Sequence, residues 1–223
     1  MYRLIKLKTI DSTQDYAKKL QLDPPFVVQA KQQTNGHGKV NRKFISKDGL
    51  FFTLVVGDLR QRPGLIVGAV AVSIIDEINE VLKKKFGNEH KSQFGIKWVN
   101  DIVDENFNKA GGILVDKRND QYYIGVGLNF NTSAVNLPNI TFIPEIKIDN
   151  LIKKILNQLI SSDTVSKYKK YSFIIGRKVI LKINDLQISG IVNDISDDLS
   201  IIINNKKYQI GEIEKIILKD YDF

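Results

Sequence analysis

The sequence predicts an α+β fold in which helices pack on a mixed or antiparallel sheet, followed by a small C-terminal β-barrel. Three observations lead to this prediction. The chain has 223 residues, 43% of them hydrophobic and 26% charged, which is enough for one substantial core and a small additional unit. Strand-like and helix-like segments alternate through the first two-thirds of the chain. After Gly176 the pattern changes to short β-rich runs separated by Asn, Asp and Gly.

The N-terminal segments predict a strand, a helix and a second strand. The apolar run near the start is typical of a strand, and Asp11, Ser12 or Thr13 can cap the helix that follows. The expected ranges are 2–7 for the first strand, 11–22 for the helix and 26–30 for the second strand.

A polar, glycine-containing stretch at residues 32–49 has neither helical nor strand periodicity. It is long for a connection inside a compact domain, so we expect a binding loop. Residues 50–56 predict a strand. The segment 63–85 has apolar residues at helical spacing, and Pro63 suits a first turn, so a core-packed helix is expected there.

Three short strand signals then follow at close spacing, at residues 95–99, 112–117 and 122–128. Short connections favour antiparallel pairing, so these segments are expected to extend an antiparallel sheet. Helical sequence returns at residues 149–161, and we expect it to continue through 165–171.

The last fifty residues predict a small barrel of the SH3-like type, because five short β-rich runs alternate with turn signals. The expected strands are 178–183, 186–191, 200–203, 206–210 and 214–218. We therefore expect two domains, a larger one over residues 1–173 and a barrel domain over 174–223.

Composition excludes several kinds of chemistry. The chain has no cysteine, which rules out disulfides, thiolate metal sites and cysteine nucleophiles. Its two histidines, His37 and His90, are too few for a zinc-type ligand set. No stretch approaches the roughly 18 uncharged apolar residues of a membrane span, and the N-terminus lacks a signal-peptide apolar block, so a cytoplasmic protein without a membrane partner is expected.

The positive charge belongs to the larger N-terminal part. The net charge is +8, from 33 basic and 25 acidic residues. Residues 172–223 hold seven basic and eight acidic residues, a net charge of −1, which leaves 26 basic and 17 acidic residues, or +9, in residues 1–171. An anionic ligand or partner is therefore expected on the N-terminal part.

The first candidate cluster is the loop sequence QTNGHGKVNRKF at residues 33–44, in which two glycines flank His37 and three cations follow. Glycines let backbone N–H groups approach a phosphate, and the cations neutralise its charge. The loop lacks the ending of a phosphate-binding P-loop and the third glycine of a dinucleotide fingerprint. Taken alone, it fits either a phosphate-binding loop or an ordinary basic surface turn.

Two further clusters each allow a purely structural interpretation as well as a functional one. In KWVND, residues 97–101, Asp101 could bind Mg²⁺, or Asn100 and Asp101 could simply form a hairpin turn while Trp98 fills the core. In KAGGIL, residues 109–114, Lys109 could present a cation into a site or could be a solvated lysine beside a turn. The sequence GVGLNFN follows at residues 125–131.

In order and spacing, these clusters resemble the biotin protein ligase (biotin–acetyl-CoA-carboxylase ligase) family, of the monofunctional type without an N-terminal DNA-binding domain. That family carries a loop usually written GRGRxGRxW, followed by KWPND, KxxGIL and GxGxNxN. The resemblance extends from Ser12-Thr13-Gln14 through the C-terminal barrel. It implies a catalytic domain like that of class II aminoacyl-tRNA synthetases, with an SH3-like domain after it.

Carried over by position, the resemblance implies a role for each matching residue. The biotin-binding residues would be Ser12, Thr13, Gln33, Gly36, His37, Lys109 and Gly112. The residues binding ATP and the adenylate would be Lys39, Arg42, Phe44, Asn100, Asn129 and Asn131. The catalytic residues would be Lys39, Lys109 and Asp101, with Asp101 also holding the metal.

The loop departs from the family pattern at several positions. His37 and Lys39 stand in place of arginines, Asn41 in place of a glycine and Phe44 in place of a tryptophan, while Val99 replaces the proline of KWPND. Because an ammonium group cannot make arginine's planar two-pronged contact with phosphate, Lys39 is expected to retain the intermediate less strongly.

The resemblance implies an ATP-dependent ligase that uses Mg²⁺, activates biotin as biotinyl-5′-AMP and transfers it to a lysine of a biotin carboxyl carrier protein or domain. A homodimer is plausible on the same ground. Two alternatives remain, a lipoate-type ligase or acyltransferase on a related fold and a basic nucleic-acid-binding protein. The second is weakened because the barrel is slightly acidic and the basic part has no recognisable nucleic-acid-binding module, so no DNA partner is expected.

Overall fold

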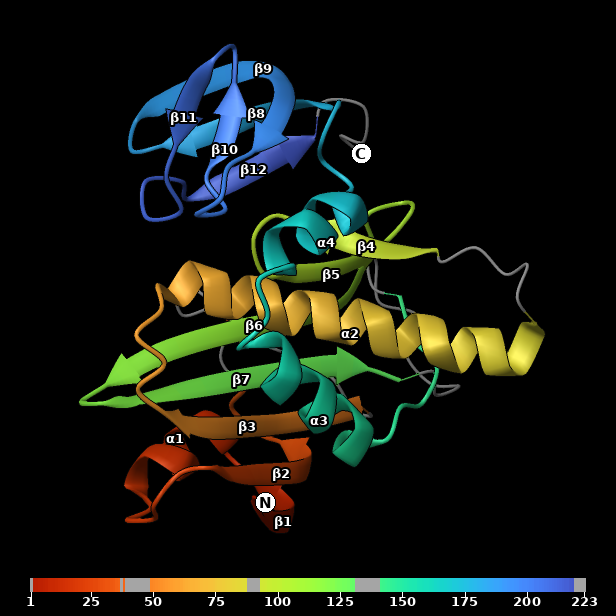
Figure 1. The fold of residues 1–223 in the computed structure, drawn as a ribbon, viewed down its shortest axis with the longest axis vertical. Helices are drawn as coiled ribbons and strands as arrows, with labels where there is room; N and C mark the ends of the chain where they lie inside the picture. The colour runs from red at the N-terminus through yellow and green to blue at the C-terminus, as the bar shows by residue number, and fades with distance from the viewer. Residues whose placement is uncertain (1, 37, 39–48, 88–92, 131–140, 219–223) are drawn as a thin grey trace.

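Two sheets organise the molecule. The computed structural model describes residues 2–36, 38, 49–87, 93–130 and 141–218. A seven-stranded sheet with its helices forms the larger part, and a five-stranded sheet lies at one end of it (Figure 1). The predicted fold class, a mixed sheet with helices followed by a small all-β unit, is thereby confirmed. In the described part of the chain, no helix is long and apolar enough to cross a membrane.

The larger sheet has the strand order β1-β2-β3-β7-β6-β5-β4. β1 and β2 pair in parallel, because helix α1 (Thr13–Lys19) carries the chain back between them. The other five neighbouring pairs are antiparallel, among them β6 and β7, whose close spacing in the sequence predicted this pairing. The strands are β1 (Arg3–Ile10), β2 (Phe26–Gln33), β3 (Gly49–Gly57), β4 (Phe94–Lys97), β5 (Asp101–Asp104), β6 (Lys109–Arg118) and β7 (Gln121–Asn129).

Helices cover opposite faces of this sheet. Successive side chains of a strand point to opposite faces. In β3, Phe52 and Leu54 are buried in the main core with helix α2 (Pro63–Phe86), whereas Val55 is buried in a smaller cluster with Ala17 of α1. We call the two sides the α2 face and the α1 face. As predicted, α2 is a core helix that begins at Pro63.

One helix prediction was wrong, because helical sequence does not continue from 149–161 into 165–171. Two helices form instead, α3 (Ile148–Gln158) and α4 (Thr164–Tyr171). Polar side chains at the junction bond locally and compete with the helix backbone. The amide of Gln158 donates to Asp163 Oδ1 at 2.7 Å and to Thr164 Oγ1 at 2.9 Å, and Ser161 Oγ donates to the same Asp163 oxygen at 2.6 Å.

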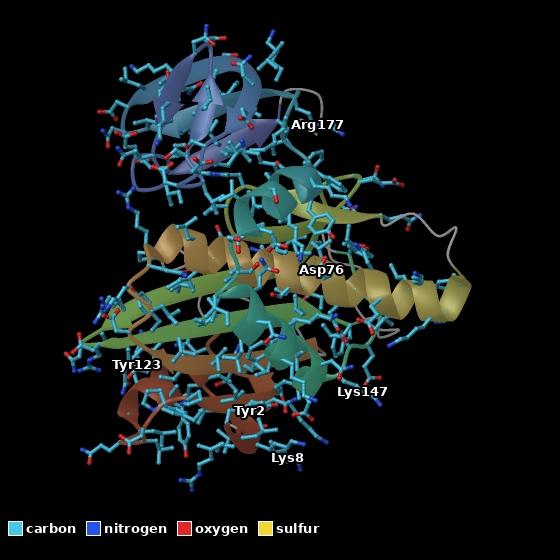
Figure 2. The ribbon with its side chains drawn as sticks, in the orientation of Figure 1. Tyr2, Lys8, Asp76, Tyr123, Lys147 and Arg177 are labelled. Atoms are coloured by element: carbon cyan, nitrogen blue, oxygen red, sulfur yellow. The ribbon has the colours of Figure 1, made fainter. Side chains whose placement is uncertain are left out.

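Polar contacts hold α4 against α2. Asp76, which lies on α2 (Figure 2), accepts a hydrogen bond from the hydroxyl of Tyr171 at 2.6 Å and lies 3.7 Å from the ammonium group of Lys167. Burial and the nearby Asp76 carboxylate raise the pKa of Tyr171 to about 12. The Tyr171 hydroxyl therefore stays protonated as the donor of this bond near neutral pH.

The smaller sheet is antiparallel, with the order β11-β10-β9-β8-β12. All five predicted runs contain a strand, because turn residues separate them clearly in the sequence. The division of the chain into domains 1–173 and 174–223 stays a prediction. The strands are β8 (Lys178–Ile183), β9 (Leu186–Ile195), β10 (Ile201–Ile203), β11 (Lys206–Tyr208) and β12 (Lys215–Leu218).

The turn between β4 and β5 joins the two sheets and α4. Trp98 donates its indole N–H to the backbone carbonyl of Leu199, which lies between β9 and β10, at 2.6 Å. The next residue, Val99, follows a cis peptide bond and accepts a hydrogen bond from the hydroxyl of Tyr168 at 3.1 Å. Leu199 is fully buried, and a Cβ on Gly68 of α2 would lie 2.5 Å from its Cδ1 atom. The turn is therefore held by two partners, Leu199 and Tyr168, both of which lie beside Gly68 of α2.

Tyr168→Phe tests this anchoring. The change leaves the buried Val99 carbonyl without the hydroxyl donor, so the free energy of unfolding should fall by about 1–3 kcal/mol in a denaturant titration. Tyr2→Phe is the matched control, because Tyr2 donates to Asp149 at the exposed surface, and its loss should be below about 1 kcal/mol. Equal losses for the two variants would show that the turn does not depend on this bond.

Candidate functional site

The start of α1 brings three of the predicted site residues together. Ser12 caps the helix, its hydroxyl accepting from the backbone N–H of Asp15 at 3.2 Å. Thr13 donates its backbone N–H to Gln33 Oε1 at 2.8 Å, and its hydroxyl lies 3.1 Å from the same oxygen. Ser12 and Thr13 are 2% and 3% exposed, so this is a buried polar cluster that requires hydrogen-bond partners.

Two polar residues that were given no role from the sequence extend this cluster. Thr53 of β3 lies with its hydroxyl 3.0 Å from that of Thr13 and 3.2 Å from Gln14 Oε1. The amide nitrogen of Gln14 donates to the Tyr123 carbonyl at 3.0 Å; Tyr123 lies on the side of the sheet near α1 (Figure 2). Thr53 could have been noticed in the sequence, because it is the single polar residue in the otherwise apolar strand sequence LFFTLVV. We call Thr13, Gln14, Gln33 and Thr53 the polar chain.

A second group of charged residues lies where β4, β5 and β6 meet. The ammonium group of Lys109 is 2.7 Å from Asp101 Oδ1, and the two side chains are 41% and 32% exposed. A pair this exposed adds little stability, but it remains accessible to a ligand. Of the two interpretations of Asn100-Asp101, the turn holds in part, since residues 98–100 make the turn and Asp101 begins β5, while Mg²⁺ binding by Asp101 stays a prediction. As predicted for the core alternative, Trp98 is buried.

Asn100 connects this charged group to β6. Its side-chain amide donates to the Ile113 backbone carbonyl at 3.2 Å, and its backbone carbonyl accepts from the Ile113 N–H at 2.9 Å. The turn is thereby tied to β6 immediately after Gly112. Asn100 thus has a structural role at the turn, and contact with a nucleotide stays a prediction for this residue.

Lys97 is a cation of this group that was not assigned a role from the sequence. It is the cross-strand partner of Asp101, and it is half-buried. Burial lowers the pKa of Lys97; the Asp101 carboxylate opposes this, and Lys215 and Lys109 add to it. Two lysines that share one carboxylate leave a net positive charge, which favours an anionic ligand. The sequence signal for Lys97 was its place in KWVND, the same short motif that contains the candidate carboxylate Asp101.

Strand register places both groups on the α1 face. Asp101 is opposite Gly112, which is opposite Gly127, and Gly127 is opposite Phe51 of β3. Directly paired residues point to the same face, and so do residues two apart in a strand. Thr53 therefore shares this face with Asp101. These two residues lie on β3 and β5, strands that are separated by three interstrand spacings, or about 14 Å.

Two glycines, which have no side chain, leave room on this face for the side chains of Lys109 and Gln14 to lie against the sheet. A Cβ on Gly112 would lie 3.3 Å from both Cε and Nζ of Lys109, and one on Gly125 would lie 2.5 Å from Gln14 Oε1. Larger residues would displace the Lys109 ammonium group or the Gln14 amide. Gly112 thus has a clear function beside Lys109; direct contact of Gly112 with a ligand stays a prediction.

Asn129 ends β7 on the same face. Its amide nitrogen donates to the Lys109 carbonyl at 3.2 Å, which links it to the charged group. Its Oδ1 atom is buried and has no hydrogen-bond partner among the described residues. An unpaired buried acceptor is costly, so this oxygen is suited to a ligand N–H or O–H.

Five predicted site residues lie outside the described part of the chain: His37, Lys39, Arg42, Phe44 and Asn131. The convergence of Lys39 with Lys109 therefore stays a prediction. Gly36, at the start of this loop, is buried just after β2.

Solved structures with the same fold are known. The chain matches a biotin protein ligase from Aquifex aeolicus in complex with biotin and ATP at 21% identity, with a TM-score of 0.82 over 97% of this chain and 99% of that one. It matches a biotin acetyl coenzyme A carboxylase synthetase from Helicobacter pylori, with bound biotinylated ATP, at 21% identity and a TM-score of 0.65 over 93% and 99% of the two chains. At this identity the matches show the fold.

A biotin protein ligase from Leishmania major in complex with biotin is also similar, at 19% identity and a TM-score of 0.61 over 89% of this chain and 93% of that one. In sequence, residues 6–131 match the model of the Biotin/lipoate A/B protein ligase family. This match includes the start of α1, the loop and both lysine-bearing strands. The chain belongs to the biotin/lipoate A/B protein ligase family.

Proposed function

We propose that this protein is a biotin–[biotin carboxyl-carrier protein] ligase, which activates biotin with ATP as biotinyl-5′-AMP and transfers it to a lysine of a carrier protein or domain. One observation supports this proposal most strongly. The buried polar chain and the Lys109–Asp101 pair share one face of the sheet and lie over different strands, as a ligand with a polar ring and a distant carboxylate requires. The solved relatives with biotin and ATP support the same ligands.

The polar chain favours biotin over lipoate, the other substrate class of the family. Biotin's ureido ring offers two N–H donors and one carbonyl acceptor, which Thr13 and Gln33 can pair with. The dithiolane ring of lipoate offers no such groups. A site built from buried polar side chains discriminates strongly against a ligand that leaves them unpaired.

The charged group suits the first step of the reaction. The biotin carboxylate attacks the α-phosphorus of ATP, the bond to the bridging oxygen breaks, and pyrophosphate leaves. In this step two anions must come together and charge develops on phosphorus, so cations that attract both are the main requirement. We assign this role to Lys109, with Lys39 from the loop as the expected second cation. Asn129 Oδ1 would accept a hydrogen bond from the nucleotide.

In the second step, the amine of an acceptor lysine attacks the carbonyl carbon of the mixed anhydride. AMP leaves, an amide bond forms, and the amine loses a proton. Neither step needs a nucleophile from the enzyme, which agrees with a chain that has no cysteine. The enzyme's contribution is positioning and charge stabilisation.

Asp101 fits a supporting role in metal binding. Among the described residues there is no group of three or more His, Cys, Asp or Glu side chains that could hold a metal. Mg²⁺ is often held by one or two carboxylates together with substrate phosphates, so the single carboxylate of Asp101 fits an ion that arrives with ATP. When bound, Mg²⁺ would neutralise phosphate charge.

The charge of the chain suggests the acceptor. Residues 1–171 carry +9, so an acidic carrier domain would be attracted to this part of the molecule. We propose that the protein works in the cytoplasm, with no DNA or membrane partner, and that it forms a homodimer. Sedimentation of the purified protein tests the homodimer directly.

Lys109→Ala should reduce adenylate formation by a hundredfold or more. Removal of one donor that stabilises developing charge costs about 3–4 kcal/mol of transition-state stabilisation, and each 1.36 kcal/mol is about tenfold in rate. Single-turnover formation of the adenylate, followed by mass spectrometry, measures the effect. The control is Lys117→Ala on the same strand, because Lys117 pairs with Asp58 at the surface, and it should retain activity. Near wild-type adenylation in Lys109→Ala would remove Lys109 from its role.

Incubation with ATP, Mg²⁺ and either biotin or lipoate tests the choice of ring. We expect biotinyl-AMP to form with a kcat/KM about 10⁴-fold above that for lipoyl-AMP, since only biotin pairs with the buried polar groups. Comparable values for the two acids, or a preference for lipoate, would contradict the proposal and favour a lipoate-type ligase.

A further inference from the structure

We propose that Leu199, in the loop of residues 196–200 between β9 and β10, is a positioning residue for the ATP step of the reaction. It acts through Trp98 on the turn that carries Lys97 and Asp101. This inference rests on the proposed function and goes beyond it, because it gives the smaller sheet a role in adenylation that the binding of biotin does not share.

Leu199 has a backbone conformation that residues with a side chain rarely adopt. Its φ angle is +62°, in the left-handed region, where a bulky residue is strained. Such a conformation persists only where the surrounding structure imposes it, and it is most frequent at functional sites. Leu199 is also fully buried, which separates it from the surface turns in which this conformation is common. Its surroundings must therefore hold it in place.

Hydrogen bonds within the loop impose this conformation. The backbone N–H of Leu199 donates to the Ser196 carbonyl at 2.8 Å, and that of Ser196 donates to the Ser200 carbonyl at 2.9 Å. Asp198 Oδ1 accepts from the Ser196 hydroxyl at 2.6 Å and from the Ser200 N–H at 3.2 Å. The loop is thus closed by its own bonds, and it presents the side chain and the carbonyl of Leu199 to the larger part of the molecule.

The Leu199 side chain lies against α2, and its carbonyl binds the turn between β4 and β5. A Cβ on Gly68 would lie 2.5 Å from Leu199 Cδ1, much closer than ordinary contact, so a glycine in α2 leaves the space that this side chain fills. The Leu199 carbonyl accepts the indole N–H of Trp98 at 2.6 Å, and the bond is buried. If the loop moved away, this donor and this acceptor would be left unpaired in the core.

A displacement of Trp98 would reach the charged group directly. Lys97 is the residue before Trp98, and consecutive Cα atoms are about 3.8 Å apart. Asp101 is the cross-strand partner of Lys97, and its carboxylate is 2.7 Å from the ammonium group of Lys109. A shift of the turn therefore moves the carboxylate that holds Lys109. A displacement of about 1 Å at groups that position reactants can cost about a hundredfold in rate.

The ring end of the site is held by other elements. Among the described residues, the hydrogen bonds of the polar chain join α1, β2, β3, β6 and β7, all of which belong to the larger part of the molecule. Loss of the contact with Leu199 should therefore impair the ATP step and leave the affinity for biotin unchanged. A general loss of structure would impair both.

Trp98→Phe removes the indole N–H and keeps an aromatic side chain in the core. At saturating biotin, we expect kcat/KM for ATP in adenylate formation to fall about 10- to 100-fold, while the Kd of biotin in calorimetry stays within about twofold of wild type. The matched control is Tyr122→Phe, which removes the hydroxyl bond from the buried Tyr122 to the Gln61 carbonyl. It should leave both values within about twofold. Wild-type ATP kinetics in Trp98→Phe, or an equal loss of biotin affinity, would overturn the proposal.

Leu199→Ala and Leu199→Met give a second test that holds even if Trp98→Phe folds poorly. Both variants keep the backbone carbonyl, but alanine withdraws the side chain that lies beside Gly68. We expect alanine to lower kcat/KM for ATP at least about tenfold with the Kd of biotin unchanged, and methionine, which is apolar and similar in volume, to restore it to within about threefold. Wild-type ATP kinetics in the alanine variant, or a loss that methionine does not restore, would contradict the role of Leu199.

The wild-type protein separates this inference from the proposed function. If wild type forms no biotinyl-5′-AMP from biotin and ATP, the proposed function fails. If wild type forms the adenylate and the variants keep its ATP kinetics, only the positioning role of Leu199 fails.

Discussion

The register between β3, β7, β6 and β5 is the constraint on which the site depends. Because Asp101, Gly112, Gly127 and Phe51 are paired across four strands, they share one face of the sheet. A shift of one residue in any pairing would move the charged group to the α2 face, where Ile96, Ile102 and Ile113 are buried. The hydrophobic core on one face therefore fixes the chemistry on the other.

The five-stranded sheet contributes to the same constraint. The turn that carries Lys97 to Asp101 is bonded to Leu199 through Trp98 and to α4 through Tyr168. Both bonds are buried, and a buried polar group that loses its partner is costly. The smaller sheet thus supports the position of the charged residues.

Periodicity predicted most elements, because the apolar spacing in α2 and the turn residues between the last five strands are strong local signals. The break between α3 and α4 was missed, since it depends on side-chain bonds made by Gln158 and Ser161. The capping role of Ser12 was among those predicted from the sequence, whereas the biotin-binding roles predicted for Ser12 and Thr13 came only from family resemblance. Gln14 and Thr53 could not be assigned, because their partners are far apart in sequence and meet only through sheet register.

A structure of the protein with a non-hydrolysable analogue of biotinyl-5′-AMP tests the central claim most directly. The account predicts that one ligand spans the α1 face, with its ureido ring within hydrogen-bond distance of Thr13 and Gln33 and its phosphate beside Lys109. The ring would lie over β3 and the phosphate over β6. A ligand bound on another face, or one that reached only the polar chain or only the charged group, would contradict it.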